Sequence, residues 1–93
     1  MPYRWLQIAF GVIATRGIEP HEVIQVLSSG HRRIVPAHTP EGIPLRSIWG
    51  RTATGRALIV VVRPVEGFDS VIIGARELSA TQGEEFEAWE NGR

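Results

Sequence analysis

Two patterns of apolar residues divide this chain, one typical of helices and the other of strands. Residues 6–15 are densely apolar, with apolar side chains recurring four positions apart, which predicts a helix. Gly17 can supply the left-handed residue that ends this helix. Pro20 then stands in the first turn of a second predicted helix, which runs to about Ser28.

After the second helix the spacing changes to short apolar runs separated by proline and glycine, which is typical of strands. The pattern predicts strands over residues 32–36, 45–50, 57–63 and 71–76. Pro36 cannot donate a ladder hydrogen bond, so the first of these strands is predicted at a sheet edge. The third strand is the most apolar, which predicts a central position with both faces covered.

A third helix is predicted to close the chain. Ser79, followed three residues later by Gln82, forms a capping-box signature, and Phe86 and Trp89 are spaced to anchor the helix to the sheet. The predicted fold is α+β, with two N-terminal helices, an antiparallel meander of three to four strands and a C-terminal helix, all helices lying on one face of the sheet. Residues 3–5 leave open a short additional strand.

The composition sets outer limits on this fold. A chain of 93 residues is the size of one domain, so a single domain over residues 1–93 is expected. The absence of cysteine excludes disulfides, thiolate zinc sites and cysteine nucleophiles, and fits a reducing compartment. No signal peptide is recognisable, and the longest apolar run, residues 57–62, is far shorter than the roughly 20 residues of a membrane helix. A cytoplasmic protein is therefore expected.

Charge is unevenly distributed along the chain. Residues 1–83 contain nine arginines and six acidic residues, whereas residues 84–93 contain four glutamates and one arginine. All ten cationic side chains are arginines, which bind phosphate and carboxylate through a planar fork. The mildly basic body is compatible with RNA or with an acidic protein as a partner.

Three segments resemble those of one family. Thr15-Arg16-Gly17-Ile18 stands where that family has a Lys-His-Gly-Val-like helix end, and Trp49-Gly50-Arg51-Thr52-Ala53-Thr54-Gly55-Arg56 is similar to its strand-turn-strand segment. Ile73-Gly74-Ala75-Arg76, followed by Ser79, is similar to its last strand and following helix. On these segments the chain resembles the BrnT family of small toxins, which share the compact ribonuclease fold of the RelE and ParE toxins.

The resemblance implies a function. It implies the toxin component of a type II toxin–antitoxin system, a metal-independent endoribonuclease that needs no cofactor and inhibits translation and growth. It also implies neutralisation by a cognate, DNA-binding antitoxin of ribbon-helix-helix or helix-turn-helix type, in a hetero-oligomer with two toxins.

Metal-independent RNA cleavage requires a cation over the developing negative charge and a positioned acid and base. Arg76 matches the family's Ala-Arg position and is the first candidate for a phosphate contact. Arg51 and Arg46 are expected to share a sheet face with it, and His38, on a predicted loop, is the candidate acid–base residue.

Each of these candidates has a simpler interpretation. Arg76 can form a surface ion pair with Glu77 or Glu41, Arg51 can be structural, and His38 can be an ordinary exposed histidine. The three histidines are irregularly spaced on different elements, so no metal site is expected. The three tryptophans are expected first in the core and only second as base-stacking platforms.

Departures from the family favour an alternative function. Thr15-Arg16 replaces the Lys-His pair, Pro44-Leu45-Arg46 stands where a Glu-Arg pair is usual, and the terminal helix is acidic instead of basic. The alternative is a non-catalytic protein-interaction module on the same scaffold, whose arginines bind an acidic protein segment.

Overall fold

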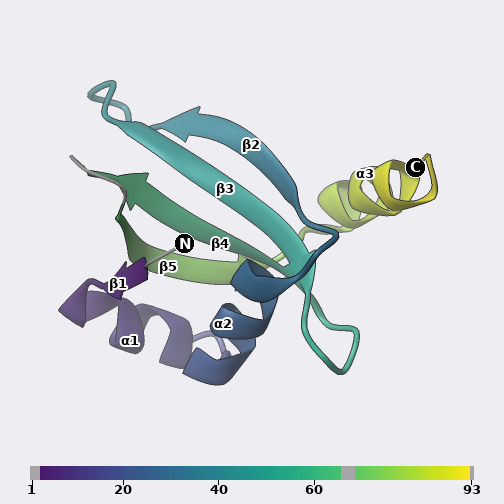
Figure 1. Ribbon diagram of the computed structural model, residues 1–93, viewed down its shortest axis with the longest axis horizontal. Helices are drawn as coiled ribbons and strands as arrows, with labels where there is room; N and C mark the ends of the chain where they lie inside the picture. The colour runs from purple at the N-terminus through teal and green to yellow at the C-terminus, as the bar shows by residue number, and fades with distance from the viewer. Residues whose placement is uncertain (1–2, 66–68, 93) are drawn as a thin grey trace.

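The computed structural model describes residues 3–65 and 69–92. A twisted sheet has α1 and α2 beneath it and α3 beyond one end (Figure 1). In chain order the elements are β1 (Tyr3–Trp5), α1 (Gln7–Ala14), α2 (Pro20–Ser28), β2 (Arg33–His38), β3 (Pro44–Arg51), β4 (Ala57–Pro64), β5 (Ser70–Glu77) and α3 (Ala80–Asn91). The predicted α+β class is confirmed.

The sheet has the strand order β1-β5-β4-β3-β2. Strands β2 to β5 form an antiparallel meander, with the apolar β4 at the centre and β2 at an edge, as predicted. The sheet differs from the predicted meander of three to four antiparallel strands by one further strand, which residues 3–5 had left open. Residues Tyr3–Trp5 pair in parallel with Ser70–Ile72, so the described sheet has five strands, is mixed, and begins before the first helix.

One face of the sheet carries the larger core, under α1 and α2. Alternate residues of the strands point to this face and meet the buried side chains of the two helices. The cluster consists of Ile13, Ile18, Val23, Val26, Leu27, Ile48, Leu58, Val60, Val62, Ile72 and Ala75. Gly50 permits the close approach of α2, because a Cβ there would lie 3.1 Å from Val26 Cγ1.

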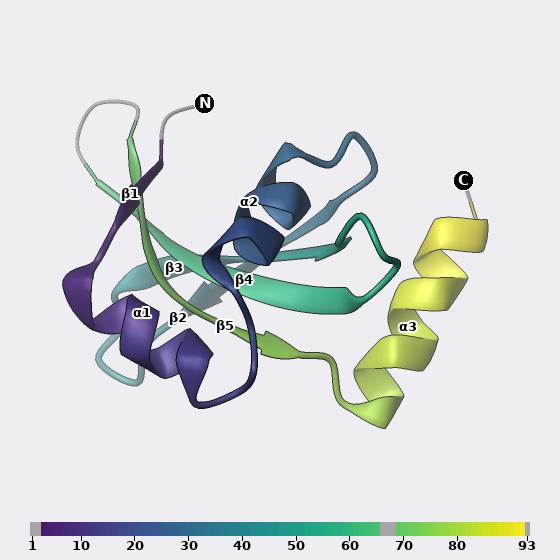
Figure 2. The same cartoon turned by 90° about the horizontal axis from the view of Figure 1, so that it is seen from below.

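The opposite face carries a smaller core under α3. Trp49 and Ile59 pack with the fully buried Phe86. The neighbours of Trp49 and Ile59 along their strands point to the larger core instead. The prediction that all helices lie on one face was therefore wrong. Leu78 packs against this second cluster, so the chain crosses to the opposite face as it leaves β5 (Figure 2).

The predicted helix boundaries are confirmed by their local geometry. Gly17 has φ 69°, the left-handed conformation that ends α1, and Pro20 is the first residue of α2. The Ser79 hydroxyl accepts a hydrogen bond from the Gln82 N–H at 3.2 Å, while the Ser79 N–H donates to Gln82 Oε1 at 3.1 Å. Among the described helices, none has both the length and the apolarity needed to cross a membrane.

Candidate anion-binding site

Many of the arginines are neutralised by nearby carboxylates. The ion pairs join Arg4 to Asp69, Arg33 to Glu85, Arg51 to Glu90, and Arg56 to both Glu22 and Glu77, at 2.8 to 3.0 Å. The hydrogen bond to the Glu77 carboxylate is the largest cause that raises the pKa of Arg56, and the hydrogen bond to Glu22 also raises it. Within residues 3–65 and 69–92, five arginines have no carboxylate at ion-pair distance: Arg16, Arg32, Arg46, Arg63 and Arg76.

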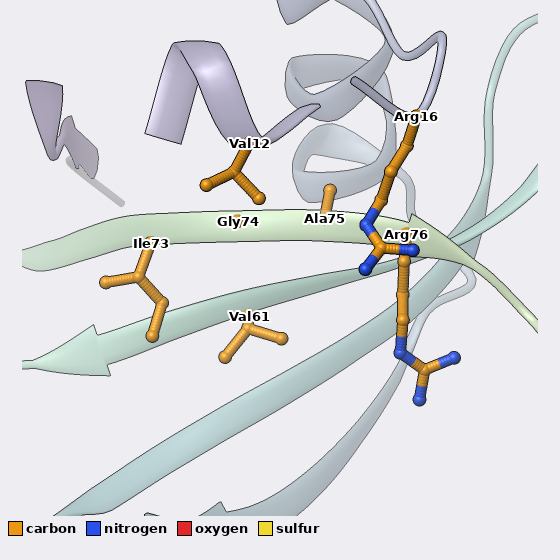
Figure 3. A pocket seen from close by; sticks show the side chains of 7 residues that line it. All are labelled: Val12, Arg16, Val61, Ile73, Gly74, Ala75 and Arg76. Atoms are coloured by element: carbon orange, nitrogen blue, oxygen red, sulfur yellow. The ribbon is translucent and has the colours of Figure 1, made fainter. Parts of the chain in front are cut away.

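Arg16 and Arg76 line the same shallow hollow, of about 230 Å³, beside β5. Arg16 extends from the end of α1 across β5, and Arg76 extends from β5 away from α1 (Figure 3). The remaining lining residues are Val12, Val61, Ile73, Gly74 and Ala75. The hollow therefore combines two guanidinium groups with an apolar wall and contains no acidic side chain in its lining.

The hollow follows from an irregularity in β5. Val61 pairs with Gly74 and Val62 with Ile72, so Ile73 is an extra residue at a bulge. A Cβ at Gly74 would lie 3.3 Å from Val12 Cγ1, so glycine lets α1 lie close against the strand here. Strand β1 pairs only with residues 70–72, which leaves this part of β5 beside α1 instead of beside a strand.

Arg76 is held by neutral acceptors. Its Nη1 donates to Gln82 Oε1 at 2.8 Å and to the Glu77 carbonyl oxygen at 3.1 Å. Arg56 Nε donates a hydrogen bond to the Glu77 carboxylate at 2.9 Å. The described hydrogen bonds of Arg76 do not involve the carboxylate of Glu77 or that of Glu41. Its side chain is thus oriented while its charge stays uncompensated.

Arg51 shares the sheet face of Arg76 but is occupied. Its Nε and Nη2 donate to the two carboxylate oxygens of Glu90 at 2.8 and 2.9 Å, and Nη1 donates to the Gly55 carbonyl oxygen at 2.9 Å. The hydrogen bonds between Arg51 and Glu90 raise the pKa of Arg51 and lower that of Glu90. This geometry agrees with the structural interpretation of Arg51.

Arg46 and His38 lie away from the hollow. Arg46 pairs with Val62, whose side chain belongs to the larger core, so the expectation that Arg46 shares the face of Arg76 was wrong. His38 is the last residue of β2, not a loop residue, and β2 is three strands from β5, about 14 Å across the sheet. The four candidates are therefore not brought together, and their individual roles stay predictions.

Arg16 is the site residue that the sequence analysis missed. It was noted only as part of a departure, because Thr15-Arg16 replaces the Lys-His pair of the BrnT-like segment. A cation immediately before the glycine that ends a helix was the available signal, since that position also favours positive charge through the helix dipole. The pairing of Arg16 with Arg76 depends on α1 packing beside β5, which the sequence pattern did not predict.

No metal centre is indicated in the part of the chain that the structure describes. There, no group of three or more His, Cys, Asp or Glu side chains is placed to hold an ion. The hollow is suited to an anion instead, through charge and guanidinium hydrogen bonds.

The chain matches no model of a known protein family, and a search of curated proteins finds no similar sequence. The resemblance to BrnT toxins stays a prediction.

Proposed function

We propose that this protein binds single-stranded RNA through Arg16 and Arg76 and acts as the toxin of a bacterial type II toxin–antitoxin pair, a metal-independent endoribonuclease that inhibits translation. The observation that carries the proposal is that Arg16 and Arg76, neither of which has an acidic partner in the described chain, line one apolar-walled hollow. Such a surface suits a phosphate and the adjoining sugar or base. The antiparallel meander between the second and third helices is the arrangement that the resemblance implies.

The chemistry would be transesterification within the RNA. The ribose 2′-oxygen forms a bond to the adjacent phosphorus, the bond to the 5′-oxygen breaks, and a 2′,3′-cyclic phosphate and a 5′-hydroxyl result. Arg16 and Arg76 would stabilise the negative charge that develops on the phosphate oxygens. The proton lost by the 2′-hydroxyl would pass to solvent, and solvent would protonate the leaving 5′-oxygen, because the described lining of the hollow includes no histidine or carboxylate.

A second candidate function is favoured by that same lining. Without a side-chain base at the hollow, the arginines can serve a non-catalytic interaction module that binds an acidic protein segment. Binding of an acidic peptide, without cleavage of RNA, would identify this alternative.

A cognate antitoxin is the proposed protein partner, DNA-binding and of ribbon-helix-helix or helix-turn-helix type, in a complex with two toxins. Support comes from the part of the sheet on the α3 face where Val35, Ala37 and Leu45 are only half-buried. An apolar surface of this kind, on the same sheet face as Arg76, suits a segment with both apolar and acidic residues.

The binding step is tested with a labelled single-stranded RNA. Arg16→Gln and Arg76→Gln should each weaken binding about tenfold, because each removes a charged hydrogen-bond donor to phosphate. Arg63→Gln is the matched control, since Arg63 is exposed in β4 and does not line the hollow. Equal losses in all three variants would reduce the binding to general charge attraction and refute the site.

The reaction and the biological role need separate tests. RNA incubated with the wild-type protein and a chelator should yield fragments ending in a 2′,3′-cyclic phosphate, and a 2′-deoxy strand should bind but stay intact. Inducible expression in bacteria should arrest growth, and Arg76→Ala should abolish the arrest. The absence of both cleavage and growth arrest would reject the toxin and leave the interaction module as the function.

A further inference from the structure

Helix α3 covers two arginines of the sheet with its own carboxylates. Glu85 Oε2 lies 3.0 Å from Arg33 Nη1, and Glu90 accepts two hydrogen bonds from Arg51. A carboxylate and a phosphate offer paired oxygens to a guanidinium in the same way. The two glutamates therefore occupy positions that phosphate oxygens of a ligand can take.

The side chain of Trp49 contacts both one of these arginines and the helix. The Arg33 guanidinium carbon is 5.1 Å from the centre of the Trp49 ring, and Phe86 of α3 packs against the same indole with ring centres 6.3 Å apart. Trp49 is only 6% exposed. Removal of α3 would uncover an indole beside two cations, the combination on which bases of single strands stack.

The indole N–H of Trp49 is a second, independent indication of a ligand. This nitrogen is buried and has no hydrogen-bond partner within the described residues. A buried donor without an acceptor is unfavourable and uncommon in folded proteins. An oxygen acceptor that arrives with a ligand would satisfy it.

The acidic residues of α3 do not stabilise the helix itself. Glu84, Glu85, Glu87 and Glu90 have no basic partner within the helix, and its last turn carries no basic residue. Glu87 and Glu90 lie toward the C-terminal end, where the helix dipole disfavours negative charge. Phe86 is the one buried residue among the described residues of this helix, and the pairs with Arg33 and Arg51 add to its attachment.

We infer that α3 is a displaceable cover over a second RNA-binding surface, formed by Arg33, Trp49 and Arg51. With α3 in place, its carboxylates satisfy the arginines and Phe86 shields the indole. When α3 is displaced, phosphates of a single-stranded RNA bind Arg33 and Arg51 and a base stacks on Trp49. The inference rests on the proposed function only in taking RNA as the ligand.

The test compares two double variants of the full chain that carry the same change in charge. Glu85→Gln/Glu90→Gln removes the carboxylates that engage the sheet, whereas Glu84→Gln/Glu87→Gln removes two exposed glutamates of the same helix that form no described ion pair. The probe is a short fluorescein-labelled oligouridylate. The first variant should bind it roughly five- to tenfold more tightly than the second, because opening α3 then costs less.

A direct readout locates the bound RNA. Addition of oligouridylate to the Glu85→Gln/Glu90→Gln variant should shift the Trp49 indole N–H resonance, assigned by its loss in Trp49→Phe. Adding Arg33→Gln to this variant should return its affinity to that of the control. Equal affinity of the two double variants, or an unmoved Trp49 resonance, overturns the inference.

The two sites can fail separately. If the surface under α3 is real but the hollow is not, Arg16→Gln will leave the affinity gain of the Glu85→Gln/Glu90→Gln variant intact and will not weaken binding in either background. If only the hollow binds RNA, Arg16→Gln will weaken binding in both backgrounds and no gain will be observed. Circular dichroism of both double variants verifies that their total helix content is unchanged.

Discussion

Arg33 and Arg76 stand at the two ends of a single row across the sheet, joined through Trp49 and Ile59. Arg33 pairs with Trp49, Trp49 with Ile59, and Ile59 with Arg76. Residues in register on adjacent strands point to the same face, so both arginines belong to the face that α3 partly covers. The hollow beside β5 and the surface under α3 are therefore two ends of one basic and aromatic row.

The salt dependence of RNA binding should report how many arginines contact phosphate. For single strands the slope of log affinity against log salt is about 0.7 per phosphate neutralised. Replacing both Arg16 and Arg76 with glutamine should therefore reduce the magnitude of the slope by about 1.4. Fluorescence anisotropy over a salt series measures it, and an unchanged slope would show that neither arginine contacts phosphate.

Two glycines of the same helix region should respond to alanine in opposite directions. Gly17 has φ 69°, so Gly17→Ala forces a left-handed backbone on alanine and should destabilise the protein by about 1 kcal/mol. A Cβ at Gly11, within α1, would point into open space, so Gly11→Ala should stabilise the protein by about 0.5–1 kcal/mol. Urea unfolding of the two variants provides the comparison, and a loss at both positions would contradict it.

The strands and helix ends could be predicted because their signals are local. Gly17, Pro20 and the Ser79–Gln82 capping box each act within one turn, and the apolar run of β4 identifies a strand with both faces covered. Strand β1 gave no such signal, since three residues carry no periodicity and its pairing partner lies at Ser70–Ile72. The side of the sheet on which α3 lies also depends on a distant contact, that of Phe86 with Trp49.

The candidate site was predictable only in part. Arg76 came from the resemblance, and its position on the α3 face agrees with the alternation along β5. The same alternation places Arg46 on the face opposite to Trp49, so the strand pattern already separated it from Arg51. Arg16 could not be paired with Arg76 from sequence, because their proximity depends on the bulge at Ile73 and on the packing of α1.

Phe86 should dominate the attachment of α3. It is fully buried, so Phe86→Ala removes a large apolar contact and leaves a cavity, and should cost about 3–5 kcal/mol of unfolding free energy or detach the helix. Phe10→Ala is the control, because Phe10 is 40% exposed and stacks only on Trp5 at the protein surface. Hydrogen exchange of α3 amides separates local detachment from global unfolding, and equal effects of the two substitutions would contradict the assignment.

Acid should loosen α3 through Glu90. The hydrogen bonds from Arg51 hold the pKa of Glu90 below its ordinary value of 4.5, so the folded state binds this proton less readily than the unfolded chain. The stability that the pair contributes is therefore complete above about pH 4.5 and is lost as the pH falls through the lower, folded-state pKa. Because Arg51 is 36% and Glu90 22% exposed, we expect a loss below about 1 kcal/mol.

Glu90→Gln isolates this contribution from that of other carboxylates. Glu22, whose pKa is lowered by the Glu19 backbone N–H and then by Arg56, titrates in both proteins. The difference in unfolding free energy between wild type and Glu90→Gln should therefore be constant above about pH 5 and shrink as the pH falls below about 4.5, because only the wild type loses the Arg51 pair by protonation. A difference that stays constant down to about pH 3 would show that Glu90 does not couple the attachment of α3 to pH.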